Sequence, residues 1–496
     1  MKNTDALITE RLLAFLVCSA VLLTFLVVRS NYLFIERLWP DEALYAWYAE
    51  QIGQHPGFIF SSQMPYPPLF PLLLLLGKLF VSGELAYRFI MLAIGTIGIV
   101  AMYQLGGRVS GHFLGAFCAL TLAFNHPYFL MGTMILMDVP LGILFILLAS
   151  ALLNIREDRH GKADGLAAAA CSAIVLTKWS GILFLPLVGT YYYLAFPNIS
   201  RKERAKRLGL TLLFPCAMLV VLILKNAWLT GKGVLSITAL KGAYFILPMT
   251  YYFQIFPQLL APFLIPFLLF GLAAVWKYER KVKVLLISWL VIFFPVYCLV
   301  PEKDPRYVLP VIPCFILLAG IGLETAVEWL TKNHHARRVF LQIFLFVCLA
   351  FLTQWNFVHV IEQHVLRKTL AYTGLGEAGE WLNRRLTKET IVFASSTRAM
   401  RYYTGLQMNT AQGRLYTYPK EREEFARIIN TAPGPVYLEV DSWEYTQPPW
   451  IFPMTEEKKE QLHVLGFSLE HAVIRPALYH DEIHPANVIW IFKRKN

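Results

Sequence analysis

Long apolar runs alternate with short polar segments along most of the chain. Each run is close to the ~20 apolar residues that an α-helix needs to cross a bilayer. The first run is followed by no small-residue cleavage site, so it predicts a retained anchor rather than a removed signal peptide. The pattern predicts a polytopic α-helical membrane protein of about 11–13 transmembrane helices. The runs are 12–28, 89–105, 112–127, 138–153, 165–178, 181–196, 208–225, 258–276, 284–300, 308–330 and 339–358.

Four of the segments between these runs are rich in Lys and Arg. They lie at 155–162, 201–207, 277–283 and 332–338. Basic loops favour the cytoplasmic side of a membrane, and placing these four there lets the intervening helices pair without conflict. The same count places the start of the helix at 138, the 301–307 segment and the C-terminal tail on the external side.

One apolar run, Leu69 to Val81, does not fit this alternation. If it crossed the membrane, every later loop would change sides. It is short for a span, and its length is typical of an interfacial or re-entrant helix. We therefore expect residues 31–87 to form one long external loop that contains two surface helices.

Composition and charge agree with a membrane protein. Hydrophobic residues make up 56% of the 496-residue chain, and the mean hydropathy is +0.50. The formal net charge of +12 comes from Lys and Arg in the short loops, so it does not indicate a nucleic-acid partner. The seven cysteines lie in or beside apolar runs and form no C-x-x-C pair, which argues against a zinc site and a disulfide framework.

The composition changes after residue 365, where helical and strand patterns alternate. Amphipathic helices are expected at 376–388 and 419–431, and strands at 391–393, 436–440 and 488–492. Such alternation predicts a small α/β domain. We expect a membrane domain at 1–365 and an external soluble α/β domain at 366–496.

Two adjacent acids, Asp41 and Glu42, follow the first apolar run in the sequence Trp39-Pro40-Asp41-Glu42. Acids at a membrane surface are costly to desolvate, so their presence needs an explanation. They could begin a surface helix, where Pro and acidic residues suit the first turn. They could also form the catalytic edge of a membrane-embedded transferase.

Four features in order make the chain resemble the polyprenyl-phosphate-dependent glycosyltransferases of the GT-C class. The resemblance is to relatives of protein O-mannosyltransferases and of the lipid A aminoarabinose transferase, glycosyltransferase families 39 and 83. It covers essentially the whole chain. The features are Asp41-Glu42, the segment from Pro67-Pro68-Leu69 to Arg88, Met137-Asp138-Val139-Pro140-Leu141, and Arg306-Tyr307-Val308-Leu309-Pro310 with Pro313.

The resemblance implies an inverting transfer of one sugar from a polyprenyl-phosphate donor to a hydroxyl of a lipid, glycan or protein acceptor. The acceptor hydroxyl needs a carboxylate base, and the departing phosphate needs positive charge. Asp41 is the expected base. Glu42 and Asp138 are further catalytic candidates, and the expected donor-phosphate residues are Arg88, Arg306, Lys178, Tyr66 and Tyr307.

The chain departs from the relatives at one position. They commonly carry a basic residue directly before the Pro-Pro pair, and this chain has Tyr66. Lys178, at an external helix end, or Lys225 could supply the missing charge. The resemblance requires no cofactor, and a divalent metal is possible, although the sequence contains no cluster of metal ligands.

Other interpretations of these residues remain open. Asp138 could cap the helix that it begins, and Arg306 could extend to the lipid headgroups. A polytopic lipid or sugar transporter or flippase is the alternative function, and a non-catalytic assembly protein is a third. The expected location is a prokaryotic inner (plasma) membrane, with the site and the C-terminal domain on the external side.

Overall fold

The computed structural model describes residues 2–33, 38–157, 161–230, 247–332, 334–408, 414–444, 447–479 and 482–495. The chain divides into two compact units. One comprises Met1–Leu33 and Ile52–Glu362, and we call it the membrane unit. The other comprises Phe34–Gln51 and Gln363–Asn496, and we call it the sheet unit.

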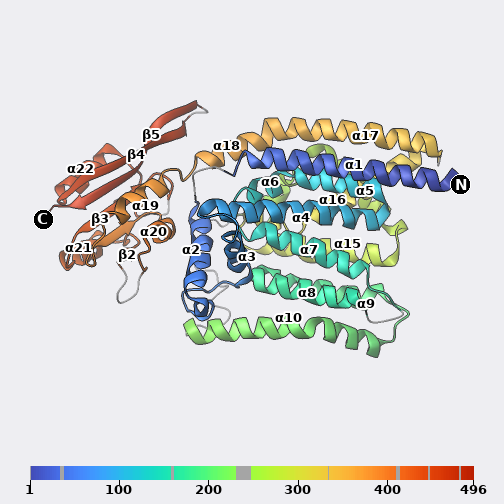
Figure 1. Ribbon diagram of the computed structural model, residues 1–496, viewed down its shortest axis with the longest axis horizontal. Coiled ribbons are helices and arrows are strands. Elements are labelled where there is room, and N and C mark those ends of the chain that lie inside the picture. Colours follow the sequence, from blue (N-terminus) through green and yellow to red (C-terminus); the bar gives the residue numbers. More distant parts are fainter. Residues whose placement is uncertain are drawn as a thin grey trace. The chain divides into compact units, whose positions relative to one another are not determined.

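The membrane unit is built from helices (Figure 1). Each of the eleven predicted apolar runs coincides with one helix or with consecutive helical segments, of which the run 258–276 contains four. The α-helices are α1 (Lys2–Ser30), α3 (Leu69–Gly77), α4 (Glu84–Ser110), α5 (His112–Ala123), α6 (His126–Gly132), α7 (Asp138–Leu153), α8 (Lys162–Thr177), α9 (Phe184–Ala195), α10 (Arg201–Thr230), α12 (Tyr251–Gln254), α13 (Phe256–Leu259), α14 (Ile265–Ala274), α15 (Arg280–Leu299), α16 (Ile312–Thr331) and α17 (His335–Asn356). Short helical turns are η1 (Pro56–Phe60), η2 (Trp179–Leu183), η3 (Pro262–Leu264), η4 (Val275–Lys277), η5 (Pro305–Val308) and the π-helix η6 (Phe357–Ile361).

Within the described residues, five helices are long and apolar enough to cross a membrane by length and composition. A sixth results if α5 and α6, which are bent by 56° at their junction, form one broken span. Helices such as α7, at Asp138–Leu153, are apolar but shorter. The chain is a multi-pass membrane protein. The run Leu69 to Val81, for which an interfacial or re-entrant helix is expected, contains α3, whose nine residues are too few to span the hydrocarbon layer.

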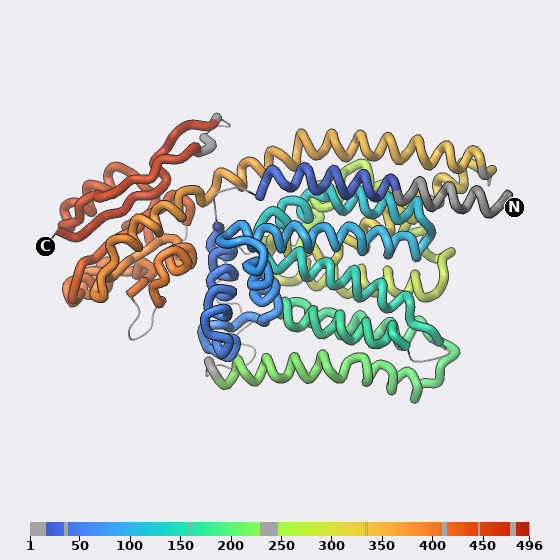
Figure 2. Tube along the Cα trace, in the orientation of Figure 1, coloured from blue at the N-terminus to red at the C-terminus, as the bar shows by residue number. Residues whose placement is uncertain are grey.

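Three of the four basic segments lie together in the membrane unit. Arg207 donates hydrogen bonds to the carbonyls of Arg156 and Glu157, and Lys281 donates to Ile155 O at 2.7 Å. These contacts join three loops that are distant in sequence. Figure 2 shows the chain traces of α7, α8 and α10 running side by side. The shared location of the three segments is what the positive-inside pattern predicts.

Small residues allow close helix packing in the membrane unit. A side chain at Gly271 of α14 would collide with the backbone carbonyl of Leu318 in α16. A side chain at Gly322 of α16 would collide with Phe267 O. Glycine at these two positions therefore brings the backbones of α14 and α16 into contact, as is common between membrane helices.

The sheet unit contains one five-stranded sheet in the order β2-β1-β3-β5-β4. Strands β2, β1 and β3 are parallel, and β5 runs antiparallel to β3 and to β4. The strands are β1 (Ile391–Ala394), β2 (Leu415–Tyr416), β3 (Val436–Asp441), β4 (Phe467–Tyr479) and β5 (Glu482–Arg494). The helices of this part of the chain are α18 (Glu362–Leu370), α19 (Leu375–Asn383), α20 (Thr397–Thr404), α21 (Arg422–Asn430) and α22 (Glu456–Val464).

The core of the sheet unit lies against one face of this sheet. Phe393 of β1 and Leu438 of β3 are fully buried and pack with Phe425 of α21 and Phe492 of β5. The predicted helices and strands after residue 365 are present as α19, β1, α21, β3 and β5. Helix α2 (Pro40–Gln54) begins in the segment Phe34–Gln51, which is part of this unit.

Candidate functional site

The membrane unit contains an ion pair between two helix ends. The Lys178 ammonium lies 2.5 Å from Oδ1 of Asp138, and their side chains are 21% and 5% exposed. Lys178 directly follows the C-terminus of α8, and Asp138 is the first residue of α7. Each charge therefore lies at the helix end whose dipole stabilises it. Asp138 does not cap its helix, because Met137 occupies the N-cap position. Its carboxylate binds Lys178 instead.

Two cations contact the ring of Tyr307. Lys178 Nζ lies 5.0 Å from the ring centroid, and the Arg306 guanidinium carbon lies 5.3 Å from it. Both distances are within the range of cation–π contacts. Burial raises the pKa of the Tyr307 hydroxyl, although Arg306 partly opposes this shift. The neutral hydroxyl donates to Glu302 Oε1 at 3.2 Å.

The turn that carries Arg306 is fixed by Asp304. Asp304 Oδ1 accepts a hydrogen bond from the Arg306 backbone N–H at 2.9 Å and so caps η5. The Tyr252 hydroxyl donates to Asp304 O at 3.1 Å. Lys178, Asp138, Arg306 and Tyr307 thus form one group of charged and aromatic side chains, which we call the basic–aromatic group. It contains two of the expected phosphate-binding cations.

The loop before the Pro-Pro pair is held by three donors from other helical segments. Trp179 Nε1 and Asn226 Nδ2 both donate to Pro65 O, at 3.2 and 3.0 Å. Lys225 Nζ donates to Met64 O at 2.9 Å. These contacts fix the backbone beside Tyr66, which is partly buried. Lys225 therefore binds this loop directly, whereas Lys178 belongs to the basic–aromatic group.

Arg88 lies in a different local arrangement. Its side chain is buried, and Nη1 donates to Thr133 O at 3.1 Å. The buried Arg29 side chain donates to the preceding carbonyl, Gly132 O. The two arginines therefore hold the end of α6, which leads into the linker before Asp138.

The two acids of the first loop lie in the sheet unit and have different environments. Asp41 is 28% exposed and forms an ion pair with Arg398 of α20. Glu42 is fully buried, and its Oε2 accepts a hydrogen bond from the Trp39 backbone N–H at 2.9 Å. This contact returns from the first turn of α2 to its N-cap position, as in a capping box. Asp41 is thus the more accessible of the two carboxylates.

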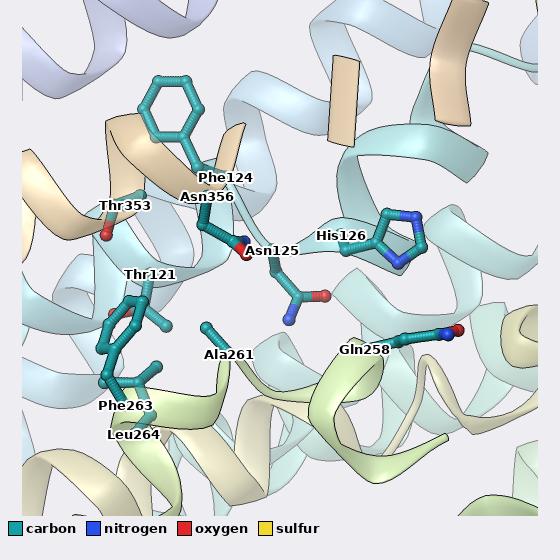
Figure 3. Close-up of a pocket in the computed structure, with 10 residues that line it drawn as sticks. All are labelled: Thr121, Phe124, Asn125, His126, Gln258, Ala261, Phe263, Leu264, Thr353 and Asn356. Carbon is teal, nitrogen blue, oxygen red and sulfur yellow. The ribbon is translucent and has the colours of Figure 1, made fainter. Parts of the chain in front are cut away.

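A small polar pocket lies elsewhere in the membrane unit, where the break between α5 and α6 approaches α17 (Figure 3). It encloses about 20 Å³, which is room for about one water molecule. An apolar cavity of about 240 Å³ shares Phe124 and Thr353 with it. None of the residues predicted to carry the chemistry lines either cavity. Among the described residues, no cluster of three or more His, Cys, Asp or Glu side chains is arranged to hold a metal ion.

Sequence reasoning did not identify Arg398, Asn226 or the loop-holding role of Trp179. Arg398 is separated from Asp41 by 357 positions, and its surroundings, Ser396-Thr397-Arg398-Ala399, form no recognisable motif. The three donors to the backbone of residues 64 and 65 could not be recognised from the sequence either. They bind backbone carbonyls, which every residue has, so no particular residue type marks the acceptor. Lys225 was identified only as a possible cation.

The architecture is that of the GT-C glycosyltransferases. The crystal structure of ArnT from Cupriavidus metallidurans bound to undecaprenyl phosphate has a TM-score of 0.66, with 14% identity and coverage of 97% of each chain. The oligosaccharyltransferase AglB from Archaeoglobus fulgidus, in complex with an inhibitory peptide and a dolichol-phosphate, has a TM-score of 0.56 and 11% identity. That match covers 95% of this chain and 74% of AglB.

Sequence comparison agrees with this class over part of the chain. The model of the Alg9-like mannosyltransferase family matches residues 244–373, which include Arg306 and Tyr307. Comparison with the sequences of curated proteins gives no match. The predicted resemblance and the predicted fold class, a GT-C membrane protein with a C-terminal α/β part, are confirmed.

Proposed function

We propose that the protein is an inverting glycosyltransferase that moves one sugar from a polyprenyl-phosphate donor to an acceptor hydroxyl. The observation that carries this proposal is the basic–aromatic group, two cations on one tyrosine ring, in a chain with the fold of ArnT. ArnT was crystallised with undecaprenyl phosphate, which is the carrier that a polyprenyl-phosphate sugar donor would release after transfer.

In the proposed reaction, the acceptor oxygen forms a bond to the anomeric carbon of the sugar. The bond from that carbon to the phosphate oxygen breaks, and its electron pair leaves with the phosphate. Lys178 and Arg306 would stabilise the resulting anion through charge-assisted hydrogen bonds. The leaving group is then an anion that needs no proton, so no general acid is required.

Asp41 is the proposed general base that accepts the proton of the acceptor hydroxyl. A hydroxyl is a poor nucleophile, and a positioned carboxylate typically contributes 10²–10⁴-fold to such a step. Asp41 is partly exposed, whereas the buried Glu42 binds the Trp39 backbone N–H. We therefore assign Glu42 to the helix start.

The remaining predicted residues have supporting roles in this proposal. Asp138 would orient Lys178, to which it is bound. Arg88 would keep the segment before Asp138 in place through Thr133 O. Tyr66 is proposed to face the donor from a loop that Trp179, Lys225 and Asn226 hold.

We propose a prokaryotic plasma membrane as the location, with catalysis on the external side. The clustered basic loops support this orientation, because such loops favour the cytoplasm. The acceptor is proposed to be a lipid, a glycan or a protein of the cell envelope.

The test is sugar transfer by the purified full-length protein in lipid nanodiscs. Undecaprenyl-phosphate sugars carrying a radiolabelled mannose, glucose, galactose or 4-amino-arabinose are supplied with an extract of envelope lipids and glycans. We expect label to move from one donor into the acceptor fraction, with release of undecaprenyl phosphate. In a parallel assay with the protein reconstituted into sealed vesicles, movement of intact donor across the membrane without any transfer would instead support a flippase.

A further inference from the structure

The C-terminal part of the chain contacts the proposed general base, Asp41, through Arg398. Arg398 lies in α20 and binds the Asp41 carboxylate within the sheet unit. We propose that Arg398 is the positioning residue that orients the Asp41 carboxylate toward the acceptor hydroxyl. This inference rests on the proposed function of Asp41 as a base.

Three cations of the C-terminal part contact residues 39–47, which lie at and after the N-terminus of α2. Lys368 Nζ lies 4.0 Å from the Trp39 ring centroid, and the Arg401 guanidinium carbon lies 3.3 Å from the ring centroid of Trp47. In the sequence, Asp41, which pairs with Arg398, lies between Trp39 and Trp47. Tyr372 also packs against Trp39, with ring centroids 4.9 Å apart. The segment that carries Asp41 is thus held along its length.

Arg398 and Arg401 are three residues apart in α20 and therefore share a helix face. Arg401 is buried, and burial lowers the pKa of its guanidinium to about 10, while Tyr48 acts in the opposite direction. It remains a cation at neutral pH. The buried contact of Arg401 with Trp47 fixes the face of α20 on which Arg398 meets Asp41.

The beginning of α20 is anchored at the carboxyl ends of two parallel strands. Ser396 Oγ donates to Asp441 Oδ2 at 2.6 Å, and Ser395 N donates to Glu439 O at 3.1 Å. All four residues are buried. Arg398 therefore projects from a rigid site, so it can define the direction of the carboxylate that it binds.

The ion pair itself contributes little to folding. The Arg398 side chain is 46% exposed and that of Asp41 is 28% exposed, and exposed pairs are weakly stabilising because solvent screens them. Its effect is therefore expected on the rate. Loss of orientation of a catalytic group by about 1 Å can lower a rate by about 100-fold.

The experiment compares Arg398→Gln, Arg398→Lys and the control Arg384→Gln in the full-length protein. Arg384 is the control because it also forms an ion pair, with Glu380, but on an exposed face of α19. We expect Arg398→Gln to lower kcat about 10- to 100-fold with an unchanged donor KM and melting temperature. Arg398→Lys should recover part of the rate, and Arg384→Gln should behave as the wild type.

Two further arms separate this inference from the proposed function. In Asp41→Asn, adding Arg398→Gln should cause no further loss of kcat, because the group that Arg398 orients is already absent. Hydrogen exchange in the first turn of α2 should be faster in Arg398→Gln than in the wild type, and this measurement needs no transfer activity. Absence of transfer by the wild type would contradict the proposed function, whereas unchanged exchange would contradict the positioning role. A wild-type kcat in Arg398→Gln would also overturn the positioning role. So would a double variant whose loss of kcat is the product of the losses in the two single variants.

Discussion

The Lys178 ammonium lies 2.5 Å from the Asp138 carboxylate, and the two residues come from the end of α8 and the start of α7. The pair joins adjacent helix ends of opposite dipole sign. It also holds Lys178 beside the Tyr307 ring. The relationship predicts that removal of either partner affects both folding and transfer.

Lys178→Met should abolish transfer and lower the melting temperature. The substitution leaves the nearly buried Asp138 carboxylate without its partner, and breaking a buried pair costs about 3–5 kcal/mol. We expect a smaller loss of stability for Lys178→Met, because a fifth of the Lys178 side chain is exposed.

The double variant Lys178→Met with Asp138→Asn provides the control, because it removes both charges. Its melting temperature should rise above that of Lys178→Met, while transfer stays absent. Transfer at the wild-type rate by folded Lys178→Met would contradict the phosphate-binding role of this lysine.

Glu42 should affect stability rather than chemistry. Glu42→Ala leaves the backbone N–H of Trp39 without the carboxylate that it binds, at a cost of about 1–3 kcal/mol. Glu42→Gln keeps an acceptor oxygen, so its melting temperature should lie closer to that of the wild type. Both variants should retain kcat within about threefold when activity is normalised to folded protein. An inactive but stable Glu42→Gln would instead show that this acid takes part in the reaction.

Glu439 should make the sheet unit less stable as the pH rises. Burial, together with the nearby Asp441 carboxylate, raises the pKa of Glu439 well above its usual range. The folded chain therefore keeps the proton to a higher pH than the unfolded chain, which releases it above pH ~4.3. Unfolding then releases a proton, so the free energy of unfolding falls as the pH rises, by up to about 1.4 kcal/mol per pH unit for one proton.

Thermal unfolding followed by tryptophan fluorescence between pH 5.5 and 8.5 measures this dependence. The side chain of Glu439→Gln cannot ionise. The melting temperature of this variant, relative to that of the wild type, should therefore rise with pH. The control is Glu380→Gln, which changes an exposed carboxylate of α19. A constant difference between Glu439→Gln and the wild type at all pH values would mean that Glu439 is ionised in the folded protein.

The sequence predicted those features that depend on the local pattern of apolar, polar and charged residues. Apolar runs located the helices, and three of the four basic segments lie together in the membrane unit. The alternation after residue 365 identified β1, β3 and β5. It did not reveal β4, whose pattern is interrupted by the polar residues His471 and Arg475.

The long-range pairings could not be predicted from one sequence. The partner of Asp138 is Lys178, 40 residues away, and the partner of Asp41 is Arg398, 357 residues away. Many Lys and Arg residues could neutralise either acid equally well. The choice among them depends on which helix ends the fold brings together, and local patterns do not contain this information.

The central claim is that Asp41 activates the acceptor for transfer from a polyprenyl-phosphate sugar. The most direct test measures kcat for the wild type and Asp41→Asn in nanodiscs, with the undecaprenyl-phosphate sugar that the wild type uses. Asparagine is nearly isosteric and cannot accept the proton, so kcat should fall at least 100-fold while the melting temperature changes little. Transfer at the wild-type rate by folded Asp41→Asn would contradict the assignment of the base.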